Sequence, residues 1–200
     1  MNGSNSGNGC RGIRRTIGRM RFGTLDFTPA LDSPDLLAAP TARALAAMGI
    51  EAADALVAPI DPGFADTAAF CANYEISMED GANCVIVQAR RGDRTWYAAC
   101  LVRGSDRADV NGVVRRHLDA RKISFAPMDD AVSLTAMEYG GITPVGLPAD
   151  WPILVDDSVA SHERLIIGSG IRGSKLLVTG SFLGSLPNAE VLAIAQASAG

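Results

Sequence analysis

The stretch "NCVIVQARRGDRTWYAACLV", residues 83–102, decides the fold class. Two apolar runs, 83–89 and 95–102, are rich in residues with high strand propensity, and they flank the polar segment Arg-Arg-Gly-Asp-Arg. A short glycine-containing loop between two such runs is typical of a β-hairpin. The sequence therefore predicts an antiparallel pair of strands near the middle of the chain.

Helical and strand-like patterns follow one another irregularly on either side of this hairpin. Before it, residues 33–49 and 66–74 fit two helices, and Asp66 or Thr67 is the expected cap of the second. After it, helices are expected over 106–122, 127–137 and 188–199, and short strands over 123–126, 151–157, 164–170 and 174–180. This order predicts a mixed α/β fold without the regular strand–helix alternation of a doubly wound sheet.

Length and composition indicate one domain with an N-terminal arm. The chain has 200 residues, of which 48% are hydrophobic, enough for a packed core. The expected domain covers residues 25–200, and residues 1–24 are expected to form a flexible, Arg-rich arm. The arm is interpreted as a solvated basic segment, with contact to RNA as the alternative.

Charge and side-chain usage exclude several classes of protein. A net charge of −4 argues against a general nucleic-acid coat, because non-specific binding depends on neutralising phosphates. No apolar run approaches the roughly 18–20 residues needed to cross a bilayer. Four cysteines without a C-x-x-C pair fit buried thiols in a reducing cytoplasm, and two histidines leave no metal-ligand spacing. We therefore expect a cytoplasmic protein without a metal or other cofactor.

The stretch "MEYGGITPVGLP", residues 137–148, follows the expected helix 127–137. Gly140 and Gly141 permit close backbone approach, Pro144 fixes its own φ, and it pushes Thr143 into an extended conformation. The result is a stiff segment with exposed main-chain N–H and C=O groups. On the residues alone, a structural turn and a ligand-facing wall fit this segment equally well.

The neighbours of this stretch make the pattern more specific. Gly140-Gly141-Ile142-Thr143-Pro144-Val145-Gly146 is followed by Val155-Asp156 and then by Gly170-Ile171-Arg172-Gly173. In order and spacing these pieces resemble the YbaK / prolyl-tRNA synthetase-associated domain family. The resemblance extends back to about residue 40 and covers roughly the last four-fifths of the chain.

This resemblance implies a barrel-like mixed β-sheet flanked by helices, with a site in a crevice on the sheet. It also implies hydrolysis, in trans, of the ester in a mischarged aminoacyl-tRNA, with the tRNA 3′ end as partner and without a metal. Backbone amides near the glycine pair would supply donors for charge developing on the carbonyl oxygen. The expected catalytic residues are Asn83, Gly141 and Asp156, and the expected substrate-binding residues are Thr67, Gly140, Thr143, Pro144, Gly146, Arg172 and Gly173.

One departure from the family pattern affects the expected activity. The family commonly has a lysine where this chain has Asn83, and Lys122 and Lys175 do not lie at such a strand start. Asn keeps donors and an acceptor but loses the charge, and a loss of ~2 kcal/mol in the transition state would slow the reaction about thirtyfold. Arg90 or Arg91 would compensate only if the fold brought one of them into the pocket.

Two alternatives to the hydrolysis of mischarged aminoacyl-tRNA therefore remain. In one, the chain is a non-catalytic module that binds an aminoacyl group, a nucleotide or a tRNA end. In the other, it uses the same fold for an unrelated structural partner. Cys84 is not interpreted as a nucleophile, because it lies within an apolar run with no histidine nearby in sequence.

Overall fold

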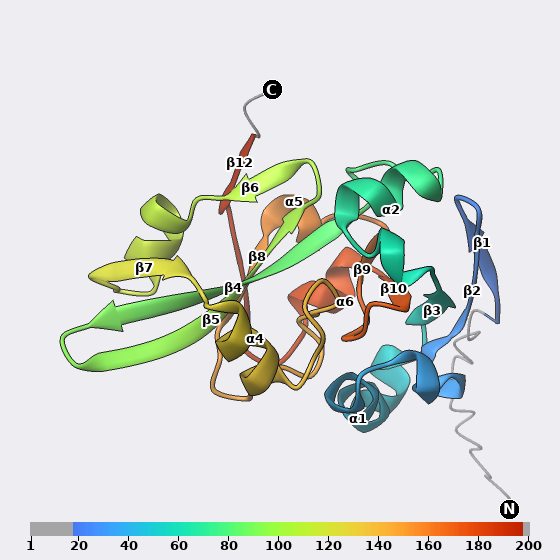
Figure 1. Cartoon of the computed structure of the whole chain (residues 1–200), viewed down its shortest axis with the longest axis horizontal. Coiled ribbons are helices and arrows are strands. Elements are labelled where there is room, and N and C mark those ends of the chain that lie inside the picture. Colours follow the sequence, from blue (N-terminus) through green and yellow to red (C-terminus); the bar gives the residue numbers. More distant parts are fainter. Residues whose placement is uncertain (1–17, 198–200) are drawn as a thin grey trace, which may run out of the picture.

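The computed structural model describes residues 18–197. Two five-stranded sheets, ordered β1-β2-β3-β10-β9 and β11-β8-β5-β4-β7, are joined by helices, and a small two-stranded sheet pairs β12 with β6 (Figure 1). The strands are β1 Met20–Phe22, β2 Leu25–Pro29, β3 Leu56–Pro59, β4 Ala82–Arg91, β5 Arg94–Arg103, β6 Asp106–Ala108, β7 Lys122–Phe125, β8 Ile153–Asp156, β9 Leu165–Gly168, β10 Ser174–Val178, β11 Ala189–Leu192 and β12 Ala195–Ala197.

Short helices connect these strands. They are α1 Ala39–Met48, α2 Thr67–Asn73, α3 Arg115–His117, α4 Met128–Thr135, α5 Asp157–Ala160 and α6 Gly180–Gly184. A π-helical turn, Val110–Val114, precedes α3, and 3-10 turns occupy Ala30–Asp32, Pro34–Leu36, Gly49–Ala52 and Pro62–Phe64. No helix within the described residues is long and apolar enough to span a membrane.

The expected hairpin is confirmed and forms the longest paired element of the fold. β4 and β5 pair antiparallel over all ten positions, from Ala82 opposite Arg103 to Arg91 opposite Arg94. β7 pairs with the outer half of β4, and β8 runs parallel to β5 on the other side. Because β4 and β5 lie inside the sheet, their central residues are buried, which explains the nearly continuous apolar runs in the sequence.

The two sheets curve around one shared core. This core takes Val57, Ile167 and Leu176 from one sheet and Ile86 and Val155 from the other. An isolated parallel bridge between Gly81 and Ile166 joins the sheets where β4 begins. The result is the curled, half-barrel arrangement of mixed α/β type that the family resemblance implied.

Local predictions near the helices are confirmed in part: the cap of the second helix is correct, whereas the helix expected over 106–122 covers only residues 110–117, because residues 106–108 form β6 and Lys122 begins β7. The Asp66 carboxylate accepts hydrogen bonds from Ala68 N and Ala69 N and so caps α2. Asp109 caps the turn before α3 in the same way. Pro40 lies in the first turn of α1, where a missing N–H costs little, so the helix begins at Ala39 rather than near residue 33.

The helix expected over 188–199 is wrong. Residues 189–192 form β11, which pairs parallel with β8, and residues 195–197 form β12, which pairs with β6. Helical spacing of small and apolar residues misled the prediction, because sheet pairing outweighs intrinsic propensity in a segment this short. Ile194, between the two strands, is fully buried.

The last residues of the expected arm belong to the sheet. Residues 20–22 form β1 and pair with β2 through a turn at Gly23. Residues 1–17 of the expected arm lie outside the described residues.

The carboxylate of Asp156 fastens the C-terminal segment to the sheet. Asp156 is 2% exposed, and it accepts hydrogen bonds from Ile194 N at 2.9 Å, Ala195 N at 2.7 Å and Ser158 N at 3.0 Å. Burial alone would raise the pKa of Asp156, but the hydrogen bonds from Ser158, Ala195 and Ile194 outweigh it and hold the pKa below its ordinary value. The ionised form is therefore the form that the fold stabilises.

We expect Asp156→Asn to lower the free energy of unfolding by about 2–3 kcal/mol at pH 7, because an amide cannot replace a charged acceptor of buried N–H groups. The folded-state pKa is depressed, so the wild-type advantage is complete above the unfolded pKa of about 4 and is lost as pH falls below it. Urea unfolding at pH 7 and pH 3.5 measures both effects, with the exposed neighbour Asp157→Asn as control. Equal stability of the two variants at pH 7 would contradict the assignment.

Candidate functional site

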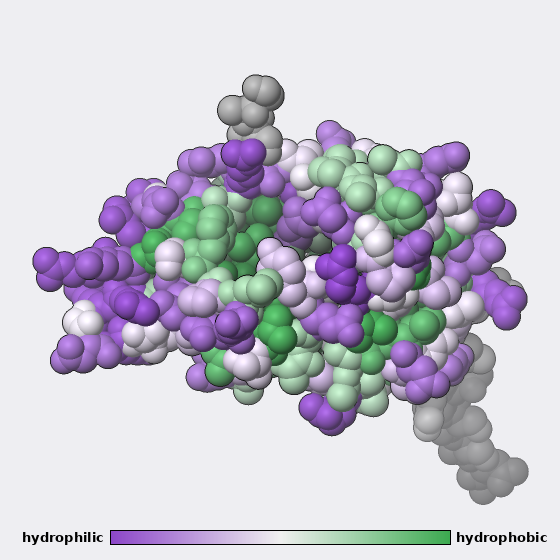
Figure 2. All heavy atoms as spheres, in the orientation of Figure 1, coloured by the Kyte–Doolittle hydropathy of each residue, from purple (hydrophilic) through white to green (hydrophobic). Residues whose placement is uncertain are grey.

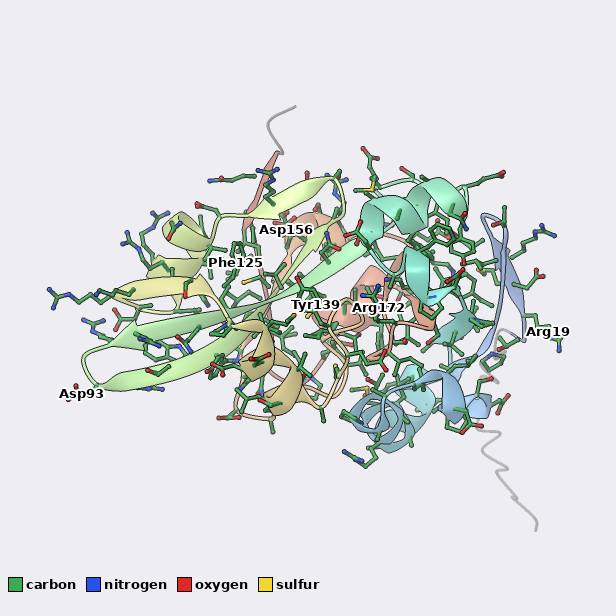
Figure 3. The ribbon with its side chains drawn as sticks, in the orientation of Figure 1. Arg19, Asp93, Phe125, Tyr139, Asp156 and Arg172 are labelled. Atoms are coloured by element: carbon green, nitrogen blue, oxygen red, sulfur yellow. The ribbon has the colours of Figure 1, made fainter. Side chains whose placement is uncertain are left out.

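A cavity of about 530 Å³ opens where the two sheets meet. Its walls come from the start of β4, the residue before α2 and its first residue, the end of β7, the start of α4, the glycine-rich segment, and β9–β10. In Figure 3, Tyr139 and Arg172 lie close together at the centre of the molecule, and Phe125 lies toward the β7 side. The lining residues used below are Asp66, Thr67, Asn83, Cys84, Phe125, Met128, Tyr139, Gly140, Ile142, Arg172 and Lys175.

Asn83 and Thr67 form a polar pair on one wall. The Thr67 hydroxyl donates to the Asn83 side-chain oxygen at 2.5 Å, from the first turn of α2 to the second residue of β4. With its oxygen engaged, the Asn83 amide group has no hydrogen-bond acceptor among residues 18–197. Its N–H donors are thus available to a ligand in the cavity.

Lys175 brings a cation to the same cavity from the other sheet. Its side chain is 7% exposed, its ammonium donates to the Ala65 carbonyl at 2.9 Å, and it lies 5.2 Å from the centre of the Phe70 ring. Burial lowers the pKa of Lys175 to about 8, and the charges of Cys71 and Asp66 partly offset this effect. The group is therefore mostly protonated at neutral pH, although part of its hydration has been replaced by protein.

Asp66 is the one carboxylate among the described residues that line the cavity. One of its oxygens accepts the two α2 N–H groups, so the carboxylate is oriented by the helix that it caps. Its charge acts favourably on Lys175. The lining of the cavity thus includes both a carboxylate and an ammonium, which suits a ligand with both a positive and a negative or polarised group.

The glycine-rich segment forms a wall of the cavity only in part. Gly140 and Ile142 line the cavity, and their N–H groups have no partner among the described residues. Gly141 instead donates to Glu138 O at 2.9 Å and accepts from Gly170 N at 2.7 Å. A Cβ atom on Gly141 would lie 2.6 Å from the backbone of Ile171, so Gly141→Ala would disturb the wall itself and is no clean probe of chemistry.

Arg172 ties this segment to the loop before α2. Its guanidinium donates to Tyr139 O at 3.2 Å and to Pro62 O at 2.9 Å, while its backbone N–H donates to the Glu138 carboxylate at 2.7 Å. Arg172 lines the cavity, so a ligand would meet a cation whose position is already fixed on two sides.

The structure brings together four of the ten residues predicted for the site, namely Thr67, Asn83, Gly140 and Arg172. Gly141 lies behind the wall, and Thr143 and Pro144 are buried. Asp156, Gly146 and Gly173 are not among the lining residues either. Asp156 instead fastens the C-terminal segment, because its oxygens accept backbone N–H groups of Ile194 and Ala195.

Sequence reasoning missed Lys175 and Asp66 as site residues. Lys175 lies within a strand of otherwise buried residues, "SKLLV", and a lone lysine in such a run was the available signal. Asp66 was recognised as a helix cap, but its place beside the cavity depends on how the two sheets meet. Arg90 and Arg91, which were considered as substitutes for the missing cation, do not line this cavity.

Cys84 lines the cavity in surroundings that keep its thiol protonated. Burial raises the pKa of its thiol far above neutrality, and the charge of Cys100 acts in the same direction. A thiol that stays protonated has little nucleophilic character. The prediction against cysteine chemistry therefore agrees with the environment of this residue.

The sequence signature of the aminoacyl-tRNA editing domain matches residues 61–183, which include every residue that lines the cavity. The chain belongs to the aminoacyl-tRNA editing domain family. No curated protein matches its sequence.

Solved structures show the same fold as this editing domain at low sequence identity. A proposed trans-editing enzyme for prolyl tRNA synthetase superposes with a TM-score of 0.66 at 17% identity, over 80% of this chain and 99% of the other. A scaffold protein used for computational epitope grafting gives a TM-score of 0.68 at 19% identity, over 82% and 99%. A hypothetical protein gives 0.60 at 22% identity, over 69% and 86%. These likenesses establish the YbaK-like fold.

We expect Lys175→Met to stabilise the editing domain at pH 7. A fall in the pKa from 10.5 to about 8 corresponds to about 3 kcal/mol for keeping the buried ammonium charged, of which the lost hydrogen bond to Ala65 would offset about 1 kcal/mol. The lysine of the unfolded chain keeps its proton up to a higher pH than the folded one, so the free energy of unfolding of the wild type rises between pH 8 and pH 10.5. The difference in unfolding free energy between the wild type and Lys175→Met therefore narrows over this range.

Urea unfolding of the wild type and the variant at pH 7 and pH 9.5 tests this expectation. Lys122→Met is the matched control, because Lys122 is exposed and its substitution removes the same charge from the surface. A Lys175→Met protein that is less stable than the wild type at pH 7 would show that the ammonium is well compensated in the fold.

Proposed function

We propose that this editing domain hydrolyses, in trans, the ester that joins a wrongly attached small amino acid to the 3′ end of a tRNA. The observation that carries the proposal is the cavity that combines Lys175, Asp66 and the free amide donors of Asn83, all in a chain that belongs to the editing family. A volume of about 530 Å³ lies within the range of small-molecule sites, roughly 300–1,000 Å³.

The reaction requires stabilisation of charge on one oxygen. Water adds to the carbonyl carbon of the ester, the bond from that carbon to the ribose oxygen breaks, and the ribose oxygen takes a proton. The products are the free amino acid and a tRNA with an unmodified terminal hydroxyl. Negative charge develops on the carbonyl oxygen, so a fixed cation or N–H donor beside that oxygen lowers the barrier.

Lys175 is suited to hold the carbonyl oxygen. Its ammonium is positioned by the Ala65 carbonyl and has two further N–H donors. In this proposal Lys175 supplies from β10 the charge that the family commonly places at the position of Asn83. Asn83 then donates neutral hydrogen bonds to the substrate, with its orientation set by Thr67.

We assign recognition of the substrate to Asp66 and to the part of the lining formed by Gly140, Ile142 and Arg172. The Asp66 carboxylate suits the amino group of the attached amino acid, which is positively charged when protonated. Gly140, Ile142 and Arg172 face the same cavity and would contact the ribose or the terminal phosphate. In this arrangement the Lys175 ammonium faces the carbonyl oxygen of the substrate, and the Asp66 carboxylate faces its amino group.

A panel of mischarged tRNAs tests the activity directly. We expect release of at least one amino acid by the wild type, and a loss of about thirtyfold in kcat/KM for Lys175→Met, corresponding to ~2 kcal/mol for one charge-assisted hydrogen bond. Arg107→Met, on β6 and away from the cavity, is the matched control. No release above background with any tRNA of the panel would contradict the proposed activity.

The pH dependence separates the charge from packing effects. Lys175 carries its charge below a pKa of about 8, so the ratio of wild-type to Lys175→Met rates is expected to be largest near pH 7 and to fall as pH rises through 8. Rates between pH 6.5 and 9, corrected for spontaneous ester hydrolysis, measure this ratio. A ratio that does not change with pH would assign Lys175 a structural role.

The second candidate function is a non-catalytic module that binds the same tRNA end. Asn83 in the place of the family lysine favours it. The double variant Asn83→Lys/Lys175→Met distinguishes the two functions, because it returns the cation to β4. Rescue of the Lys175→Met loss supports an enzyme whose cation has moved, whereas turnover only in Asn83→Lys proteins supports a module that has lost catalysis.

A further inference from the structure

A second, strongly basic groove lies next to the cavity. It has a volume of about 490 Å³ and runs along the edge strand β7 and the π-helical turn before α3. The charged residues that line it are all cations: Arg90, Arg115, Arg121 and Lys122. Figure 2 shows that hydrophilic residues cover the tip of the β4–β5 hairpin, at the left in the orientation of Figure 1.

The four cations of this groove are not neutralised by the protein. None of them forms an ion pair with a carboxylate within residues 18–197, in contrast to Arg91, which pairs with Asp119. All four are exposed. Arg90 is held in place by a hydrogen bond to the Gln88 side-chain oxygen at 2.7 Å, and the Arg121 backbone N–H donates to Arg90 O at 2.9 Å.

The chain as a whole has a net charge of −4, so the groove is a local concentration of positive charge. Like charges that lie together without counter-ions repel one another, and the repulsion is relieved when a polyanion binds. The polar, uncharged residues Asn111 and Ser124 complete the lining and can donate to phosphate oxygens. The groove is therefore suited to a run of phosphates rather than to one isolated ion.

The groove and the cavity lie next to each other along β7, so a polyanion bound in the groove can continue toward the cavity. β7 lines both sites, since Lys122, Ile123 and Ser124 face the groove and Phe125 faces the cavity. Three steps along a strand span roughly 10 Å, about three times the axial rise of one nucleotide in a strand. Phe125 is 65% exposed and Tyr139 is 60% exposed at the rim of the cavity, where aromatic rings can stack on unpaired bases.

We infer that this groove binds the sugar–phosphate backbone of the RNA whose 3′ end enters the cavity. The inference rests on the proposed function for the direction of the strand, but the binding itself does not depend on catalysis. Phosphates just before the terminal nucleotides lie against Arg121 and Lys122, and an unpaired base stacks on Phe125. The groove thus recognises the acceptor end of the RNA by charge and spacing, without reading its sequence.

Binding of an uncharged RNA tests the groove independently of the chemistry. The probe is a fluorescent acceptor-stem hairpin ending in an unpaired CCA, measured by anisotropy at several salt concentrations. Arg121→Gln/Lys122→Gln is expected to reduce the slope of log K against log salt by about 1.8 for duplex contacts or about 1.4 for single-stranded ones. Between 50 and 200 mM salt, that difference is roughly seven- to twelvefold in affinity.

A double variant with the same loss of charge elsewhere is the control. Arg43→Gln/Arg107→Gln removes two exposed cations from α1 and β6, away from the groove. An equal loss of affinity in both double variants, or no loss in the groove variant, would overturn the inference. Phe125→Ala is expected to weaken binding of the hairpin but not of a fully duplex RNA.

Substrate length separates this inference from the proposed activity. We compare hydrolysis of a full aminoacyl-tRNA with that of an aminoacylated adenosine, which carries no phosphate that could occupy the groove. Groove variants are expected to lose activity only on the full tRNA, and equal losses on both would overturn the inference. If the wild type hydrolyses neither substrate but the groove variants still lose RNA binding, the proposed activity fails and the groove stands.

Discussion

Backbone packed directly against backbone holds the cavity in shape. The segment around Gly141 lies against the turn between β9 and β10, and a Cβ on Gly141 would come within 2.6 Å of the Ile171 backbone. A Cβ on Gly168 would likewise come within 2.7 Å of the Ile142 carbonyl. Two reciprocal hydrogen bonds, from Glu138 N to Gly170 O and from Gly170 N to Gly141 O, lock the contact. Gly140 and Ile142 consequently face the cavity on a wall that has no side-chain filler behind it.

Much of this architecture could be predicted from local sequence patterns. The hairpin, the α2 cap at Asp66 and the strands before and after residue 160 follow from periodicity and capping, which depend on neighbours along the chain. The strands at 189–192 and 195–197 could not be predicted in this way. Their pairing depends on β8, β6 and the Asp156 carboxylate, all far away in sequence.

The candidate site, too, could be predicted only in part, because its residues come from elements that are far apart in sequence. The resemblance to the editing family led to Thr67, Asn83, Gly140 and Arg172, which the fold brings together around one cavity. It also led to Asp156, which does not line this cavity and whose carboxylate accepts the backbone N–H groups of Ile194 and Ala195. Lys175 and Asp66 escaped notice because a family pattern points to a residue position, whereas electrostatics depends on where the charged atom ends up. A lysine from another strand can bring its ammonium to a cavity that the pattern assigns to β4.

The cavity has a further property because its walls belong to different sheets. Lys175 comes from the sheet of β10, while Asn83 and Phe125 come from the sheet of β4 and β7. The sheets share a core, so a small rotation of one against the other would change the separation of the ammonium and the amide together. A ligand that contacted both Lys175 and Asn83 would therefore bridge the two sheets directly, in addition to the core that they share.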